Sequence, residues 1–343
     1  MATWSSMRFS AFGTDCLVRV PGHADETREV LAAVRDRAMT IHGEMSVFDP
    51  ASAVSRLNAS SGTGLTAVPE DVARILARAS EMGAVTDGAF DVTVGPLASL
   101  WKPCIREGRV PSSEEIMRAR ESVGWEHVRV DEAGRRVALD AGTSVDLGGI
   151  AKGYAANEFE RILRDHGISD ALLDLGGSVT VLGAPDEAGA WTVGIQDPLA
   201  PTGVAAAQVR VSDTSVVTSG TNERFFVRGG VRYHHVVDPR TGSPTQTGLL
   251  GVTFIGPDAL VADALATAAL VAGATEAVGW ARSLGLELVL VFEDGGVVST
   301  SPSVVGPSPE RCALPWRAST RCGRGSRRTC SARHHRPRRP RAG

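Results

Sequence analysis

The order of helix-like and strand-like segments along the chain constrains its fold more than any other feature. Apolar residues recur at helical spacing over residues 25–45, and Pro69, followed by two acidic residues, predicts the start of a second helix. After residue 128, short apolar runs separated by glycine turns predict strands, and further helices interrupt the series. Because helices and strands mix without the strict alternation of βαβ units, the sequence predicts a mixed sheet-and-helix fold of the α+β class.

The predicted helices cover residues 25–45, 69–86, 112–123, 149–166, 257–272 and 274–284. The predicted strands cover residues 15–20, 128–131, 136–139, 171–174, 179–182, 191–196, 206–211, 215–218, 225–227, 233–237, 249–255, 286–292 and 297–299. Residues 101–110 are predicted to form a loop. The strands at 225–227 and 233–237 are expected to form a hairpin across Gly229 and Gly230.

The charge is divided unevenly between the body of the chain and its end. The whole chain carries −3, but residues 301–343 contain 11 arginines, no lysine and one acid, Glu310, so residues 1–300 carry −13. We therefore predict one domain over residues 1–300 and a low-complexity, disordered, basic tail over 301–343. An acidic body argues against nucleic acid as the main partner, although the tail alone leaves nucleic acid or an acidic membrane as alternatives.

The cysteines and the N-terminal segment indicate the cellular compartment of the protein. The five cysteines form neither a CxxC pair nor a Cys/His metal spacing, which favours a reducing compartment. The N-terminal segment lacks the basic start and apolar run of a signal peptide, and no stretch reaches the length of a membrane span. We therefore expect a cytoplasmic protein.

Polar groups concentrate between apolar strands from Ser219 to Thr267. Asp263 and Thr267 are four residues apart in a predicted helix, so both oxygens project from one face and could form half of a site for a hard cation. The alternative is an aspartate at a helix N-terminus and a threonine bonded to a backbone carbonyl. His234 and His235 are adjacent in a predicted strand and should point to opposite faces, so only one can serve a site. The other interpretation is a core histidine bonded to Asp238, which itself should cap a turn.

A second polar motif flanks a glycine pair. Asp146 and Lys152 lie on either side of Gly148 and Gly149, where a predicted strand leads into a helix. Glycines there allow a ligand to approach closely, and a helix N-terminus favours phosphate. A simple turn with a solvent-exposed lysine is the alternative.

Six motifs in one order resemble the ApbE-type flavin transferases over roughly residues 8–295. These enzymes move FMN from FAD onto a hydroxyl of a target flavoprotein. The motifs are Ala11–Thr14, Met45–Pro50 with Ser55–Asn58, Gly88–Leu97, Val145–Ala155, Leu175–Ser178, and Ser219–Gly242 followed by Asp263–Thr267.

The resemblance implies a role for each site residue. Mg²⁺ would be bound by Asp263, Thr267 and the backbone carbonyl of Gly149. Asp146 and Lys152 would contact FAD, the substrate, with Asp146 also a candidate base. His235 aligns with the family's histidine and is expected to act as general acid or base, with His234 in place of the family's serine.

The remaining positions concern the nucleotide. The family pattern implies that the backbone of Ala89, Phe90 and Asp91 reads the adenine, and that Val237 borders the flavin or adenine through its backbone. Phe12 stands where the family usually has methionine. Phe48 stands where it often has a tyrosine that stacks on the flavin, so a stacking face is retained without the phenol hydroxyl.

The resemblance predicts a Mg²⁺-dependent FAD:protein FMN transferase that acts on a Ser/Thr hydroxyl of an acceptor flavoprotein and releases AMP. An FAD pyrophosphatase, with water as the acceptor, would use the same ligands. A flavin-binding protein without turnover is the alternative outside the enzymes.

Overall fold

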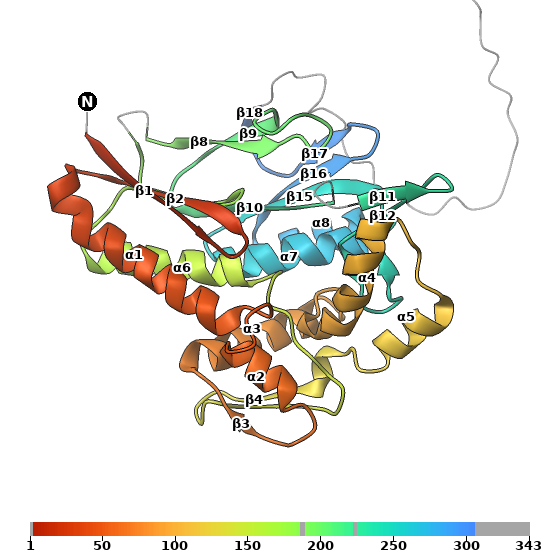
Figure 1. Cartoon of the computed structure of the whole chain (residues 1–343). Coiled ribbons are helices and arrows are strands. Elements are labelled where there is room, and N and C mark those ends of the chain that lie inside the picture. The colour runs from red at the N-terminus through yellow and green to blue at the C-terminus, as the bar shows by residue number, and fades with distance from the viewer. Residues whose placement is uncertain (1–2, 186–188, 222–224, 306–343) are drawn as a thin grey trace, which may run out of the picture.

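An eight-stranded antiparallel sheet organises the fold (Figure 1). The computed structural model describes residues 3–185, 189–221 and 225–305. The strands lie in the order β1-β2-β6-β7-β10-β15-β16-β17. Their bounds are β1 Trp4–Ala11, β2 Thr14–Pro21, β6 Ala171–Leu175, β7 Ser178–Leu182, β10 Thr214–Gly220, β15 Leu249–Gly256, β16 Glu287–Phe292 and β17 Val297–Ser299.

Helices cover one face of this sheet (Figure 1). They are α1 (Ala24–Met45), α6 (Ala151–Asp165), α7 (Ala259–Ala272) and α8 (Ala274–Leu284). Helix α7 packs against β10, β15 and α6. Its buried positions lie on all sides and include six alanines, so small side chains allow it to sit between the sheet and a neighbouring helix.

A three-stranded sheet covers the opposite face. It consists of β8 (Trp191–Gln196), β9 (Ala205–Val211) and β18 (Val304–Val305). Val193 and Val209 pack against Val216 and Val289 of the large sheet. Strand β18 lies beyond the predicted domain boundary at residue 300, where Val304 pairs with Val209 of β9. The rest of the predicted tail, from residue 306, lies outside the described residues.

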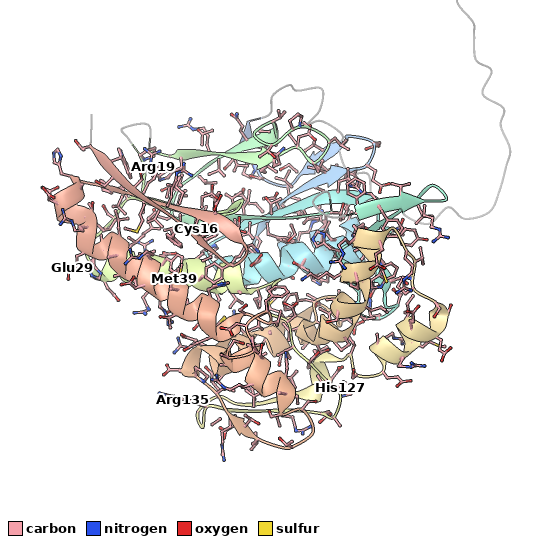
Figure 2. All side chains as sticks on the ribbon, in the orientation of Figure 1. Cys16, Arg19, Glu29, Met39, His127 and Arg135 are labelled. Atoms are coloured by element: carbon pink, nitrogen blue, oxygen red, sulfur yellow. The ribbon has the colours of Figure 1, made fainter. Side chains whose placement is uncertain are left out.

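Most of the other elements pack on the far side of the helices from the large sheet, whereas the hairpin of residues 225–234 lies level with that sheet (Figure 1). They are α2 (Ala53–Ala59), α3 (Glu70–Val85), α4 (Gly95–Glu107), α5 (Ser113–Arg120), the 3-10 turns η1 (Val92–Val94) and η2 (Trp125–His127), and the short strands β3 (Thr66–Ala67), β4 (Val128–Asp131), β5 (Arg136–Leu139), β11 (Phe225–Arg228), β12 (Val231–His234), β13 (Val237–Asp238) and β14 (Ser243–Pro244). Figure 2 shows His127 and Arg135 at this end and Cys16 in the large sheet.

The α+β class is confirmed, two local predictions were wrong, and helix α2 and strand β1 were not predicted. Residues 101–110 are largely helical, because α4 buries Leu97, Trp101 and Cys104 at helical spacing despite Pro103. The strand predicted over 233–237 ends at His234, and β13 begins separately. Strand β1 was not predicted, although Met7, Phe9 and Ala11 alternate with the polar Arg8 and Ser10. It is an edge strand, and Ala11 is its one fully buried residue.

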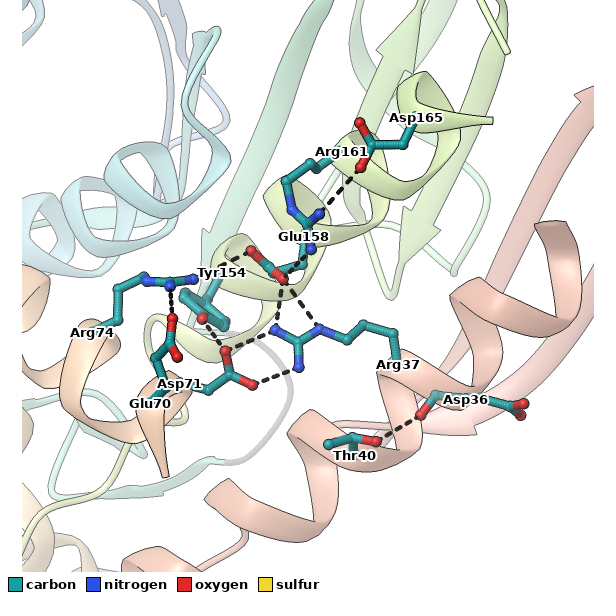
Figure 3. A network of polar contacts seen from close by, with 10 residues as sticks. All are labelled: Asp36, Arg37, Thr40, Glu70, Asp71, Arg74, Tyr154, Glu158, Arg161 and Asp165. Atoms are coloured by element: carbon teal, nitrogen blue, oxygen red, sulfur yellow. Dashed lines mark hydrogen bonds and ion pairs between the residues drawn. The ribbon is translucent and has the colours of Figure 1, made fainter. Parts of the chain in front are cut away.

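A buried polar network ties α6 to α1 and α3 (Figure 3). Arg37 donates to both oxygens of Asp71 at 2.5 and 2.7 Å and to Glu158 at 2.6 Å. The hydroxyl of Tyr154 donates to Asp71 at 2.6 Å. The Arg37 and Tyr154 hydrogen bonds hold the pKa of Asp71 below its usual value, against its burial. The network fixes α6, whose first turn carries Lys152.

The two cysteines of the described residues are structural. Cys16 and Cys104 are buried and form no disulfide. Burial raises the pKa of the Cys16 thiol to about 11, so the thiol stays protonated and unreactive at neutral pH. Within the described residues, no helix is long and apolar enough to cross a membrane.

Candidate functional site

Asp263 lies where α6 and α7 pack against each other most closely. A Cβ atom added to Gly153 of α6 would lie 2.3 Å from the carbonyl oxygen of Ala259 and 2.6 Å from the Cα of Leu260. The glycine therefore allows backbone-to-backbone contact between the two helices. This contact places the Asp263 side chain, which is 1% exposed, against the first turn of α6.

The carboxylate of Asp263 completes the N-terminus of α6. Ile150, the N-cap residue, provides no side-chain cap, and the Gly153 N–H donates to Oδ2 of Asp263 at 3.0 Å. Nζ of Lys152 lies 3.1 Å from Oδ1 and 3.3 Å from Oδ2. Asp263 thus satisfies one of the free N–H groups of a helix N-terminus and is neutralised by a lysine on the same turn. The alternative prediction of a solvent-exposed lysine was wrong.

Thr267 lies one turn further along α7 and meets two other motifs. Its Oγ1 is 3.3 Å from Oγ of Ser219 at the end of β10. A Cβ atom on Gly149 would lie 3.5 Å from this Oγ1 and 3.3 Å from Cε2 of Phe90. The structure therefore brings Gly149, Asp263 and Thr267 together at the start of α6. Asp263 does not cap its own helix: the N-cap of α7 is Asp258, which accepts from the N–H groups of Leu260 and Val261.

These three residues fit a hard cation. A buried carboxylate, a hydroxyl and a backbone carbonyl are the oxygen donors that Mg²⁺ prefers. The described residues contain no cluster of three or more His, Cys, Asp or Glu side chains that could hold a metal. A cation here would therefore depend on few protein ligands, as expected where phosphates and water complete the coordination.

Asp146 and the segment of Asp91 lie side by side. The Asp146 N–H donates to the Val92 carbonyl at 2.7 Å, and its Oδ1 accepts from the Gly148 N–H at 2.8 Å. Asp91 accepts from the N–H and hydroxyl of Thr93 at 2.7 and 2.6 Å. Burial raises the pKa of Asp91, against these hydrogen bonds. The Asp91 carboxylate therefore holds the η1 turn.

The residues that are predicted to contact the nucleotide differ in their exposure. Ala89, Phe90 and Val237 are buried, and the predicted contact of their backbone with a nucleotide stays a prediction. Phe48 is 77% exposed, with Nζ of Lys102 4.1 Å from its ring centroid. Phe12 has a left-handed φ of 56°, and its N–H donates to Nδ1 of His42 at 3.3 Å.

The turn after Phe12 adjoins another motif. A Cβ atom on Gly176 would lie 2.1 Å from Oγ1 of Thr14, so the β6–β7 turn packs directly on the β1–β2 turn. An open depression of about 540 Å³ lies there, lined by Ser10, Ala11, Gly13, Thr14, Asp15 and His42. Two of the six motifs thus meet at one end of the large sheet.

The two histidines differ in environment. His234 is buried, its Nε2 lies 3.0 Å from the Thr245 carbonyl, and its Nδ1 accepts from the Val236 N–H. Because the Thr245 carbonyl can only accept, Nε2 carries a proton. Because Nδ1 accepts, it carries none, and the His234 ring is therefore neutral. Its partner is not Asp238, whose carboxylate pairs with Arg240. His235 is exposed and follows the last residue of β12. The two side chains thus differ in burial, and His235 is the accessible one.

His234 should make stability depend on pH. Burial lowers its pKa to about 4, below its unfolded value, so the unfolded chain binds the proton more readily and stability falls as pH drops from about 6.5 to 4. His234→Gln retains an N–H donor without this titration. On acidification to pH 4, we expect the variant to lose less unfolding free energy than the wild type. The difference between the two losses should be up to about 3 kcal/mol. Urea unfolding of both proteins at pH 7 and 4.5 measures this, and equal losses would contradict it.

Several known proteins are similar to this chain in sequence. The sequence model of the ApbE family matches residues 12–290. The FAD:protein FMN transferase of Treponema pallidum is 34% identical over 82% of this chain and 83% of its own length. That of Escherichia coli K12 is 32% identical over 84% of each chain.

Solved structures show the same fold. The ApbE protein of Thermotoga maritima superimposes with a TM-score of 0.78 at 34% identity, covering 86% of this chain and 96% of that one. The flavinyl transferase ApbE of Pseudomonas stutzeri gives 0.76 at 29% identity, covering 88% and 95%. Fold and relatives together define an enzyme of the transferase class. The chain belongs to the ApbE family.

Proposed function

We propose that the chain is a Mg²⁺-dependent FAD:protein FMN transferase that moves FMN from FAD to a Ser/Thr hydroxyl of an acceptor flavoprotein. The names of its relatives support the reaction. The structural observation that supports it most is the buried Asp263, held with Thr267 and Gly149 at the N-terminus of α6.

The reaction exchanges one phosphorus–oxygen bond for another. The pyrophosphate bond of FAD breaks, the acceptor oxygen bonds to the FMN phosphorus, and AMP leaves with the electron pair. Bound Mg²⁺, held by Asp263, Thr267 and the Gly149 carbonyl, would neutralise the charge on the phosphates. The positive end of α6 and the Lys152 ammonium favour phosphate at the same place.

The hydroxyl proton needs an acceptor. Both Asp146 and His235 are proposed for this role. His235 is exposed, so the hydroxyl of a second protein can reach it. Asp146 already accepts a hydrogen bond from Gly148, which orients its carboxylate at the glycine turn.

The metal and hydroxyl requirements can be tested together. Acceptor flavoproteins are incubated with the enzyme, FAD and Mg²⁺, and intact mass reports a gain of one FMN. We expect EDTA to abolish the gain, Mg²⁺ to restore it, and replacement of the modified Ser or Thr by alanine to prevent it. Labelling that continues in EDTA, or that is found on another residue type, would contradict the proposal.

Phe48 should contribute to FAD binding without contributing to stability. Because its ring is exposed, Phe48→Ala should change the unfolding free energy by less than about 0.5 kcal/mol. Loss of stacking should weaken FAD binding by about tenfold, and Phe48→Tyr should retain it. Met117→Ala, at an exposed apolar position in α5, is the matched control. Calorimetric titration with FAD measures the affinities, and equal affinity of Phe48→Ala and wild type would refute the stacking role.

A further inference from the structure

The Asp263 carboxylate has one fixed partner and one movable partner. The fixed partner is the backbone N–H of Gly153, held by the close packing of α6 on α7. The movable partner is the Lys152 ammonium, at the end of a flexible side chain that is 22% exposed. Among the described residues, Lys152 is the one cation in an ion pair with Asp263.

A buried carboxylate needs this counter-charge. Removing a charge from water is costly unless it is paired and hydrogen-bonded, and the Asp263 side chain is 1% exposed. The single N–H of Gly153 compensates only partly, since it binds Oδ2, and Lys152 is the one donor to Oδ1 among the described residues. The ammonium therefore stabilises the site when no metal is bound.

We propose that Lys152 is the resident counter-ion of Asp263, and that a divalent cation displaces its ammonium from the carboxylate and thereby presents it to the FAD phosphates. The inference rests on the proposed metal site. A metal and an ammonium on the same carboxylate oxygens repel each other, so binding of one weakens binding of the other. The displaced ammonium remains beside the N-terminus of α6, where phosphate is favoured.

This order of events gives Lys152 a positioning role. Without metal, its charge is directed at Asp263 and is unavailable to substrate. With metal bound, the ammonium faces the substrate. The FAD phosphates then meet two cations, the metal ion and Lys152. We therefore expect metal to promote FAD binding through Lys152.

The wild-type protein provides a direct test, because the chain has two lysines, Lys152 and Lys102. Lysine acylation by an N-hydroxysuccinimide ester, followed by peptide mass spectrometry, measures the reactivity of each amine without FAD. We expect Mg²⁺ to raise the reactivity of Lys152 about tenfold relative to Lys102, the internal reference. Asp263→Asn should give the higher reactivity without Mg²⁺. An unchanged ratio in wild type would overturn the proposal.

A metal-binding measurement tests the same competition from the other side. Lys152→Met keeps the aliphatic side chain and removes the charge, and should bind Mn²⁺ about tenfold more tightly than wild type, equivalent to about 1.4 kcal/mol. Lys102→Met, at the exposed lysine over Phe48, should bind as wild type does. Lys152→Arg restores a cation and should reverse the gain. Equal or weaker Mn²⁺ binding by folded Lys152→Met would contradict the displacement.

These experiments separate the inference from the proposed function. Both are done without FAD or acceptor, so competition is observed or refuted whether or not FMN is transferred. Should Lys152→Met fail to fold, the acylation experiment on wild type still decides the question. Failure of Mn²⁺ to bind wild type and Lys152→Met alike would contradict both the inference and the metal assignment.

Discussion

Asp263→Asn is expected to reduce FMN transfer by about 10²–10³-fold. Asparagine has nearly the same shape, and its side-chain oxygen can still accept from the Gly153 N–H, so the α6–α7 contact should survive. The variant loses the negative charge that the proposed Mg²⁺ requires. Its unfolding free energy should fall by no more than about 2 kcal/mol, because the cost of burying the charge disappears along with the Lys152 ion pair.

Rates of acceptor labelling at increasing Mg²⁺ concentration measure this effect. Asp258→Asn is the matched control, since Asp258 lies on the same helix and caps its N-terminus. That variant should lose about 1 kcal/mol of stability and keep its rate. If Asp263→Asn transferred FMN at more than a tenth of the wild-type rate, the assignment of Asp263 as the essential ligand would be wrong.

Gly153→Ala is expected to be the most destabilising single methyl addition at the site. The new Cβ would lie 2.3 Å from the Ala259 carbonyl oxygen and 2.6 Å from the Leu260 Cα, both backbone atoms that cannot rotate away. The helices must separate, at a cost of about 1–3 kcal/mol or more. Separation also withdraws Asp263 from the first turn of α6, so activity should fall with stability.

Gly43→Ala provides the control for this substitution. Gly43 lies in α1, and a Cβ there would meet no atom within 4 Å. Alanine favours a helix interior by up to about 1 kcal/mol over glycine, so this variant should be slightly more stable than wild type. Thermal unfolding of both variants measures the contrast. Equal unfolding temperatures would contradict the close contact of Gly153 with the backbone of α7.

Periodicity in the sequence predicted most of the helices, because their buried faces are continuous. The predicted bounds of α1, α3, α7 and α8 fall close to those observed. Residues 101–110 were predicted to form a loop, whereas α4 continues through Pro103, because the burial of Leu97, Trp101 and Cys104 outweighs the lost hydrogen bond. Their spacing of four and three residues was the available signal.

The sequence named the residues of the candidate site, and it did not predict their contacts. The spacing of Asp263 and Thr267 indicated a common helix face, and the resemblance supplied Gly149. The Lys152–Asp263 ion pair joins residues 111 positions apart, and no local pattern encodes such a pair. Sequence likewise could not choose between His234 and His235 without the family alignment, because burial depends on strands β11 and β12 and on the Thr245 carbonyl.

The central claim is best tested by following AMP and acceptor mass in one reaction with wild-type enzyme, FAD and Mg²⁺. Candidate acceptor flavoproteins from the same organism are compared in parallel, with Asp263→Asn as the impaired control. We predict one AMP released for each FMN gained by the acceptor, and a rate about 10²–10³-fold lower for both products with the variant. Release of AMP and free FMN with no acceptor labelled, or FAD that binds and remains intact, would contradict the assignment as a transferase.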